Sequence, residues 1–191
     1  MSLARAAYRS RQFFASLGAR LSPAERQTIA AHLTPAQQRL FSAMTVRDQR
    51  HSLDVLQALQ RMGCQEEEVL LAALLHDVGK GSVRLWHRVA YVLLQAASPR
   101  LLDRLAQPNG PALSLPNGRG WRWAIAAIRD HGARGAALAE AAGASAAVVE
   151  LIRHHQRACP ELAEGACPEG SEGADGSDRR VALLRAADES C

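Results

Sequence analysis

The chain is poor in aromatic residues and almost lacks lysine. Phe, Trp and Tyr make up 4% of its 191 residues, whereas apolar residues make up 48%, with Ala and Leu dominant among them. Strands draw on β-branched and aromatic side chains, while Ala and Leu favour helices. The composition therefore argues against a β-rich protein and predicts an all-α fold, at a length that suits one domain.

Signals for membranes and for structural zinc are absent as well. No continuous apolar stretch reaches membrane-spanning length, and the N-terminus lacks the apolar run of a signal peptide. We expect a cytoplasmic protein with no membrane partner. None of the four cysteines forms a C-x-x-C pair, which argues against a zinc knuckle. The net charge of +4 is not gathered into a basic stripe with interleaved aromatics, so a nucleic-acid-binding helical protein is the lesser alternative.

The scarcity of lysine singles out one residue. Arginine supplies 22 of the 23 basic residues, and Lys80 is the exception. In a chain with this bias, a position where charge alone matters is filled by Arg. A position that keeps Lys is expected to need a compact ammonium in place of a planar guanidinium. Lys80 is therefore a candidate functional residue, and its survival by chance is the alternative.

Helix ends are clearly marked along the chain. Ser22-Pro-Ala-Glu25 and Thr34-Pro-Ala-Gln37 are capping boxes with proline at the first helical position. Thr45 begins a helix for which Gly63 is a natural left-handed stop. Further helices are expected over residues 66–78, from a cap at Ser82 to 94, from Ser98 onward, and over 121–130, 132–142, 144–157 and 178 to the end.

Two segments interrupt this pattern. Residues 107–120 are rich in Pro and Gly and predict a loop. Residues 158–165 and 166–173 repeat one another at six of eight positions, and the stretch is acidic with almost nothing to bury. We expect residues 1–44 to form an N-terminal helical extension packed on the core, and residues 45–191 to form the main domain, with 158–177 as an acidic surface loop.

Two histidines and two aspartates are predicted to point into the core. His51 and Asp188 each share a helical face with apolar residues, and His76-Asp77 directly follow the run VLLAALL. Each residue alone is explained by core packing or helix capping. A buried carboxylate needs a partner, however, because an isolated buried charge is costly. Two imidazoles and two carboxylates that converge in one core indicate a divalent metal.

The segment LLAALLHDVGK resembles the HD superfamily of metal-dependent phosphohydrolases. The resemblance runs from the His of RHSLDVLQAL through the doublet to the Asp of ALLRAADES, over residues 45–190. It implies an all-α HD-domain bundle whose metal is held by His51, His76, Asp77 and Asp188. It also implies hydrolysis of a nucleotide or another small phosphoester.

The segment DHGARGAALAEAAGASAAVVELIRHHQ looks like the part that carries extra ligands in the HDIG and HD-GYP branches. By this resemblance His131, His154 and His155 would complete a second metal position, with Asp77 bridging. Adjacent helical residues point about 100° apart, so the alternative is one ligand and one histidine outside the ligand set. The Gly-Tyr-Pro tripeptide is absent after the pair, which argues against cyclic di-GMP as substrate. No acidic pair follows the doublet, which argues against ppGpp.

The chemistry expected of such a site is hydrolysis assisted by a divalent ion. Mn, Fe, Mg and Zn all suit mixed imidazole and carboxylate ligands, with one ion expected and a second allowed. Asp77 would bind the ion and receive a proton from the attacking water, and Lys80 would stabilise the phosphoryl group. The alternative is a regulatory HD module that binds metal or nucleotide without turnover. Whether the protein is a homo-oligomer stays open.

Overall fold

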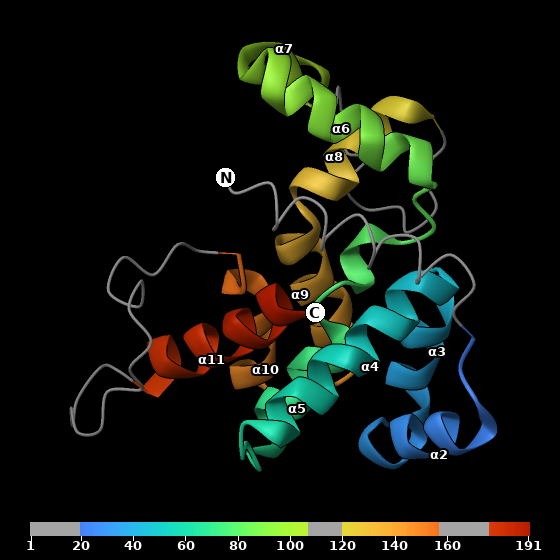
Figure 1. Cartoon of the computed structure of the whole chain (residues 1–191), viewed down its shortest axis with the longest axis vertical. Coiled ribbons are helices and arrows are strands. Elements are labelled where there is room, and N and C mark those ends of the chain that lie inside the picture. The colour runs from blue at the N-terminus through green and yellow to red at the C-terminus, as the bar shows by residue number, and fades with distance from the viewer. Residues whose placement is uncertain (1–19, 107–119, 157–175) are drawn as a thin grey trace.

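Helices build the whole of the described structure. The computed structural model describes residues 20–106, 120–156 and 176–191, and these ranges contain helices but no strand (Figure 1). The prediction of an all-α fold is confirmed. In chain order the elements are α2 (Pro23–His32), α3 (Pro35–Ala43), α4 (Val46–Arg61), α5 (Glu67–Leu75), the short 3-10 helix η2 (Val78–Lys80), α6 (Leu85–Ala97), α7 (Pro99–Ala106), α8 (Trp121–Arg129), α9 (His131–Ala141), α10 (Ala146–His154) and α11 (Gly176–Ser190).

The predicted caps of the first helices are confirmed. At the start of α2, the Ser22 hydroxyl accepts from the Glu25 backbone N–H at 3.3 Å, and the Glu25 carboxylate accepts from the Ser22 N–H at 2.8 Å. Thr34 forms the same reciprocal box before α3, and Thr45 caps α4. Gly63 follows α4 with a φ of 81°. These ends are set by side chains three residues apart, which is why the sequence reveals them.

Several helix ends differ from the prediction. The apolar run predicts a helix to residue 78, whereas α5 ends at Leu75 and the chain turns into η2. This tighter turn carries the backbone of Gly79 onto the start of α9. The expected cap at Ser82 is wrong, because α6 begins at Leu85 with Arg84 before it. α10 begins later than expected, after Ser145. Residues 107–119 of the loop predicted over 107–120 lie outside the described residues, as does the acidic repeat at 158–173.

α5 is the central helix of the main core. Its apolar residues from Val69 to Leu75 are almost all buried, and α2, α3, α4, α10 and α11 pack around it. Ile29 of α2 and Phe41 of α3 belong to the same buried cluster as the residues of α4 and α5. Segments before and after residue 45 thus share a core, and the domain boundary at that position stays a prediction. Because α5 is enclosed on all sides, the residues that follow it enter the interior.

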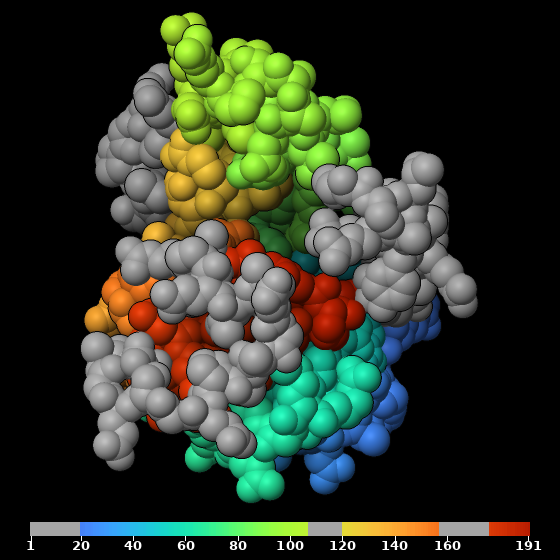
Figure 2. Space-filling view, turned by 60° about the vertical axis from the view of Figure 1, so that its left-hand side comes forward, coloured from blue at the N-terminus to red at the C-terminus, as the bar shows by residue number. Residues whose placement is uncertain are grey.

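α6, α7 and α8 form a smaller unit beside the main core. Leu102, Ala106, Ile125 and Ala126 make a separate buried cluster, and the unit lies at the top of Figures 1 and 2. No residue of α6 is buried, and Trp86 is 54% exposed. None of the described helices combines the length and apolarity needed to cross a bilayer.

Candidate metal centre

Six side chains from distant parts of the chain meet where α5 ends. They are His51 of α4, His76 and Asp77 after α5, His131 at the start of α9, His155 after α10 and Asp188 near the end of α11. His76 and Asp77 are each 1% exposed, since the enclosed helix α5 leads straight into them. The doublet is therefore the fixed centre of the cluster, and the other helices bring their side chains to it.

The backbone fixes the tautomers of three buried histidines. Nδ1 of His76 lies 2.8 Å from the carbonyl oxygen three residues earlier, and Nδ1 of His131 and of His155 lie 2.7 Å from theirs. A carbonyl oxygen only accepts, so each Nδ1 carries the proton and each Nε2 keeps its lone pair. The three imidazoles thus present acceptors to the site. This is the state in which histidine binds a metal through Nε2.

Asp77 lies among these acceptors. Its Oδ2 accepts from Lys80 Nζ at 2.7 Å, while its Oδ1 lies 3.5 Å from His76 Nε2 and 3.4 Å from His131 Nε2. Oδ1 of Asp77 and Nε2 of His76 are buried without a hydrogen-bond partner. Buried acceptors that face one another without a donor are unfavourable, and a divalent cation satisfies all of them together. The residues present therefore fit a metal ion.

The ligand atoms form two groups that share Asp77. His51, His76 and Asp77 make one group, and Asp77, His131 and His155 make the other, with the candidate ligand atoms of each within 4.8 Å of one another. Nε2 of His131 lies 3.2 Å from Nε2 of His155. Two lone pairs at that separation repel each other unless a cation or a proton lies between them. The arrangement suits one ion with a second position beside it.

Asp188 reaches the first group through His51. Its Oδ1 lies 2.7 Å from His51 Nε2 and 3.7 Å from His76 Nε2. Burial would raise the pKa of Asp188, but the hydrogen bond from His51 outweighs it and brings the pKa to about 2. Burial opposes protonation of His51, yet the bond to Asp188 raises its pKa. Both residues are free to bind a metal once this bond is exchanged for the ion.

The charges in the second group favour ligands without protons. Burial would raise the pKa of Asp77, but Lys80 and the surrounding imidazoles hold it well below its ordinary value. Burial and then Lys80 lower the pKa of His131 to about 3. Burial and then His76 lower the pKa of His155 to about 4. At neutral pH these side chains are a carboxylate and two neutral imidazoles, which is the form that binds a cation.

The adjacent histidines after Arg153 divide between two environments. His155 faces the cluster, whereas Nε2 of His154 lies 2.7 Å from Oε1 of Glu150 on the same helix, and His154 belongs to neither ligand group. The expectation that both face the site thus differs from the structure, because neighbouring helical residues diverge by about 100°. Sequence reasoning assigned no role to Gln156, whose Nε2 lies 3.1 Å from His131 Nε2. Its position directly after the pair was the one available signal.

The low pKa values of His131 and His155 predict a loss of stability in acid. Both lie below the value of 6.5 for a free imidazole, so the unfolded chain binds more protons than the folded chain as the pH falls below that value. For metal-free protein we expect a loss of roughly 2 kcal/mol per imidazole from pH 7 to pH 5, which the raised pKa of His51 partly offsets.

Thermal melts of chelated protein from pH 8 to pH 5 check this expectation. His155→Gln should flatten the decline of the melting temperature, because it removes one of the two groups. His32→Gln, on the distant helix α2, should leave the slope as in the wild type. A melting temperature that stays constant or rises toward pH 5 would contradict the prediction.

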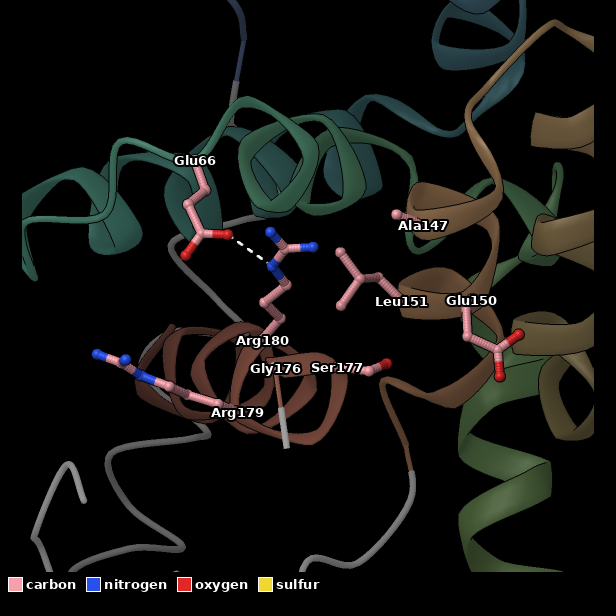
Figure 3. Close-up of a pocket in the computed structure, with 8 residues that line it drawn as sticks. All are labelled: Glu66, Ala147, Glu150, Leu151, Gly176, Ser177, Arg179 and Arg180. Atoms are coloured by element: carbon pink, nitrogen blue, oxygen red, sulfur yellow. Dashed lines mark hydrogen bonds and ion pairs between the residues drawn. The ribbon is translucent and has the colours of Figure 1, made fainter. Parts of the chain in front are cut away.

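The surface recess in Figure 3 lies away from this cluster. It has a volume of about 540 Å³ and is bounded by Glu66 before α5, by α10 and by the first residues of α11. Arg180, on its wall, is tied to Glu66 at 2.6 Å. Asp188 lies near the other end of α11, about 18 Å from Gly176 at 1.5 Å per residue. The recess is therefore not part of the candidate metal centre.

Comparison with known proteins adds one finding. The model of the HD domain family matches residues 49–98. The matched segment contains His51, His76, Asp77 and Lys80, and it supports the HD superfamily for this chain. No curated protein and no solved structure shows a significant match. The family match ends before His131, so it says nothing of the second ligand group.

Proposed function

We propose that this protein is a hydrolase of the HD superfamily that uses a divalent metal to cleave a nucleotide or another small phosphoester. One observation carries the proposal: Oδ1 of Asp77 is buried without a hydrogen-bond partner between Nε2 of His76 and Nε2 of His131. Lys80 satisfies the other oxygen of this carboxylate, and a divalent cation would satisfy Oδ1 together with the two imidazole nitrogens. The HD match over the same doublet supports the reaction class.

His51, His76, Asp77 and Asp188 would hold the first ion. Asp77, His131 and His155 offer a second position, as in the HDIG type, and His154 is left out because it pairs with Glu150. Mn, Fe, Mg and Zn all suit these donors. A divalent ion held by these residues would supply Lewis-acid chemistry, activating water and offsetting charge on the phosphoryl oxygens.

Lys80 is the residue that we assign to the phosphoryl group. Its ammonium uses one N–H on Oδ2 of Asp77, and its side chain is 19% exposed, so two donors remain for a phosphate oxygen. A carboxylate whose pKa lies well below its ordinary value holds a proton poorly. We therefore assign Asp77 the role of ligand in preference to that of proton acceptor.

Phosphate release from a panel of phosphoesters tests the function. Protein purified without chelator is incubated with nucleoside mono-, di- and triphosphates, cyclic nucleotides and p-nitrophenyl phosphate, with and without added Mn²⁺. Release that EDTA abolishes and Mn²⁺ restores would support a hydrolase. Bound metal without release from any compound would support the regulatory HD module instead.

Replacement of Lys80 by arginine is expected to slow turnover while the fold and the metal are kept. A guanidinium is larger than an ammonium and has its donors fixed in a plane, so it cannot reproduce the contact with Asp77 and reach a phosphate as well. We expect Lys80→Arg to lower kcat by about 10-fold or more, and Lys80→Ala to lower it further. Metal content and circular dichroism serve as controls. Wild-type kinetics in Lys80→Arg would show that charge alone matters here.

A further inference from the structure

Arg134 of α9 is a largely buried arginine that has no hydrogen-bond partner among the described residues. It is 9% exposed, and its guanidinium carbon lies 4.8 Å from the centroid of the Trp123 ring. Within the described residues, no carboxylate or carbonyl oxygen accepts a hydrogen bond from this guanidinium. The N–H groups of this guanidinium therefore have no acceptor among the described residues and remain available to an anion.

The surroundings do not compensate for this charge. The closest acid along the chain is Asp130, which attracts Arg134, but both of its carboxylate oxygens are bound by Arg129, at 2.8 and 2.9 Å. Nε1 of Trp123 is a second buried donor without a partner. An indole N–H and a stacked guanidinium thus lie together, and neither has an acceptor. Such a pair is complementary to an oxyanion.

These donors lie next to the proposed reaction centre. Arg134 is three residues beyond His131 on α9, so the two side chains are neighbours on one helix face. α8, which carries Trp123, packs on both α9 and η2, and η2 ends with Lys80 (Figure 1). Arg134 therefore lies on the α9 face that carries His131, and Lys80 lies on the η2 segment against which α8 and α9 both pack.

We propose that Arg134 and Trp123 form an anion-binding subsite that takes a phosphate or carboxylate group of the substrate beyond the group that is cleaved. The guanidinium offers two parallel N–H donors to such a group, and the indole N–H offers a third. The subsite selects substrates with two anionic groups, such as bisphosphorylated nucleosides or dinucleotides. The assignment of the anion to a substrate rests on the proposed function, whereas the ability of these two residues to bind an anion does not.

Inorganic phosphate tests the subsite without any need for activity. The full chain is treated with a chelator to remove bound metal, and its melting temperature is followed as phosphate is added. We expect a rise of about 5 °C at a phosphate concentration about 100-fold above Kd. Arg134→Met should abolish the rise. Circular dichroism and the melting temperature without phosphate show whether the variant is folded.

Two further variants keep the test decisive. Arg122→Met removes an exposed arginine on the same helix as Trp123 and should keep the full rise. Trp123→Phe keeps an aromatic ring but loses the N–H, so phosphate should raise its melting temperature by less than in the wild type. This variant tests the subsite even if Arg134→Met does not fold. An undiminished rise in Arg134→Met or Trp123→Phe would overturn the subsite, as would an equal loss in Arg122→Met.

Kinetics separate the two sources of the anion. Substrates that carry one phosphate are compared with substrates that carry two. Arg134→Met should raise KM about 10-fold for the substrates with two phosphates and leave KM unchanged for those with one. An equal KM change for both kinds would overturn the assignment to the substrate and leave a site for free oxyanions. Absence of turnover in the wild type would contradict the proposed function and leave the phosphate titration unaffected.

Discussion

Protein with Asp77→Ala, purified without chelator, is expected to lose its metal, whereas the wild type should carry about one ion or more per chain. Asp77 is the one residue that belongs to both ligand groups, and its free Oδ1 lies within 3.5 Å of two Nε2 atoms. Its removal takes the shared anionic ligand from both groups and leaves Asp188, beside His51, as the remaining carboxylate among the proposed ligands. We expect metal affinity to fall by well over 10-fold.

Elemental analysis of the purified variants measures this directly. Asp77→Asn keeps the shape of the side chain but loses its charge, and it should lose metal as well. Asp103→Ala removes a carboxylate that is 67% exposed on α7, and it should keep the wild-type content. Full metal content in both Asp77 variants, with the fold intact by circular dichroism, would remove the basis of the metal assignment and of the proposed reaction.

Gly79→Ala is expected to destabilise the protein severely. A Cβ at this position would lie 2.0 Å from the carbonyl oxygen of His131 and 2.6 Å from the backbone nitrogen of Gly135. Both atoms belong to the backbone of α9 and cannot turn aside as a side chain does. Separation of η2 from α9 would also pull Lys80 away from the second ligand group. We expect a loss of more than about 4 kcal/mol, or a fall in melting temperature of about 10 °C or more.

A graded series of glycines makes this test quantitative. At Gly135 a Cβ would meet the Ile152 side chain at 3.2 Å, and at Gly176 it would meet nothing within 4 Å. Gly135→Ala should therefore cost an intermediate amount, and Gly176→Ala should stay within about 0.5 kcal/mol of the wild type. Chemical denaturation of the three variants supplies the comparison. Equal stabilities at positions 79 and 176 would show that η2 does not pack tightly on α9.

Local chemistry accounts for what could be predicted. Helix caps such as Ser22 with Glu25 join residues three positions apart, and the pattern that produces them is visible in the printed sequence. The end of α5 was predicted three residues too late, because the apolar run continues through Val78. The η2 turn that follows α5 brings Gly79 against the backbone of α9, more than fifty positions away in the chain. A contact with a distant helix cannot be recognised from the few residues around Val78.

The sequence by itself determined the all-α class, the helix caps and the burial of His76 and Asp77. Each of these features follows from residues within a few positions of one another. Only the tertiary structure decided which other side chains meet this doublet. His51 and Asp188 form their bond across 137 positions, and His131 meets His155 across 24. The choice of His155 over His154 and the lack of an acceptor for Arg134 were decided in the same way. They depend on how helices rotate and pack against one another, and packing is a property of the whole chain.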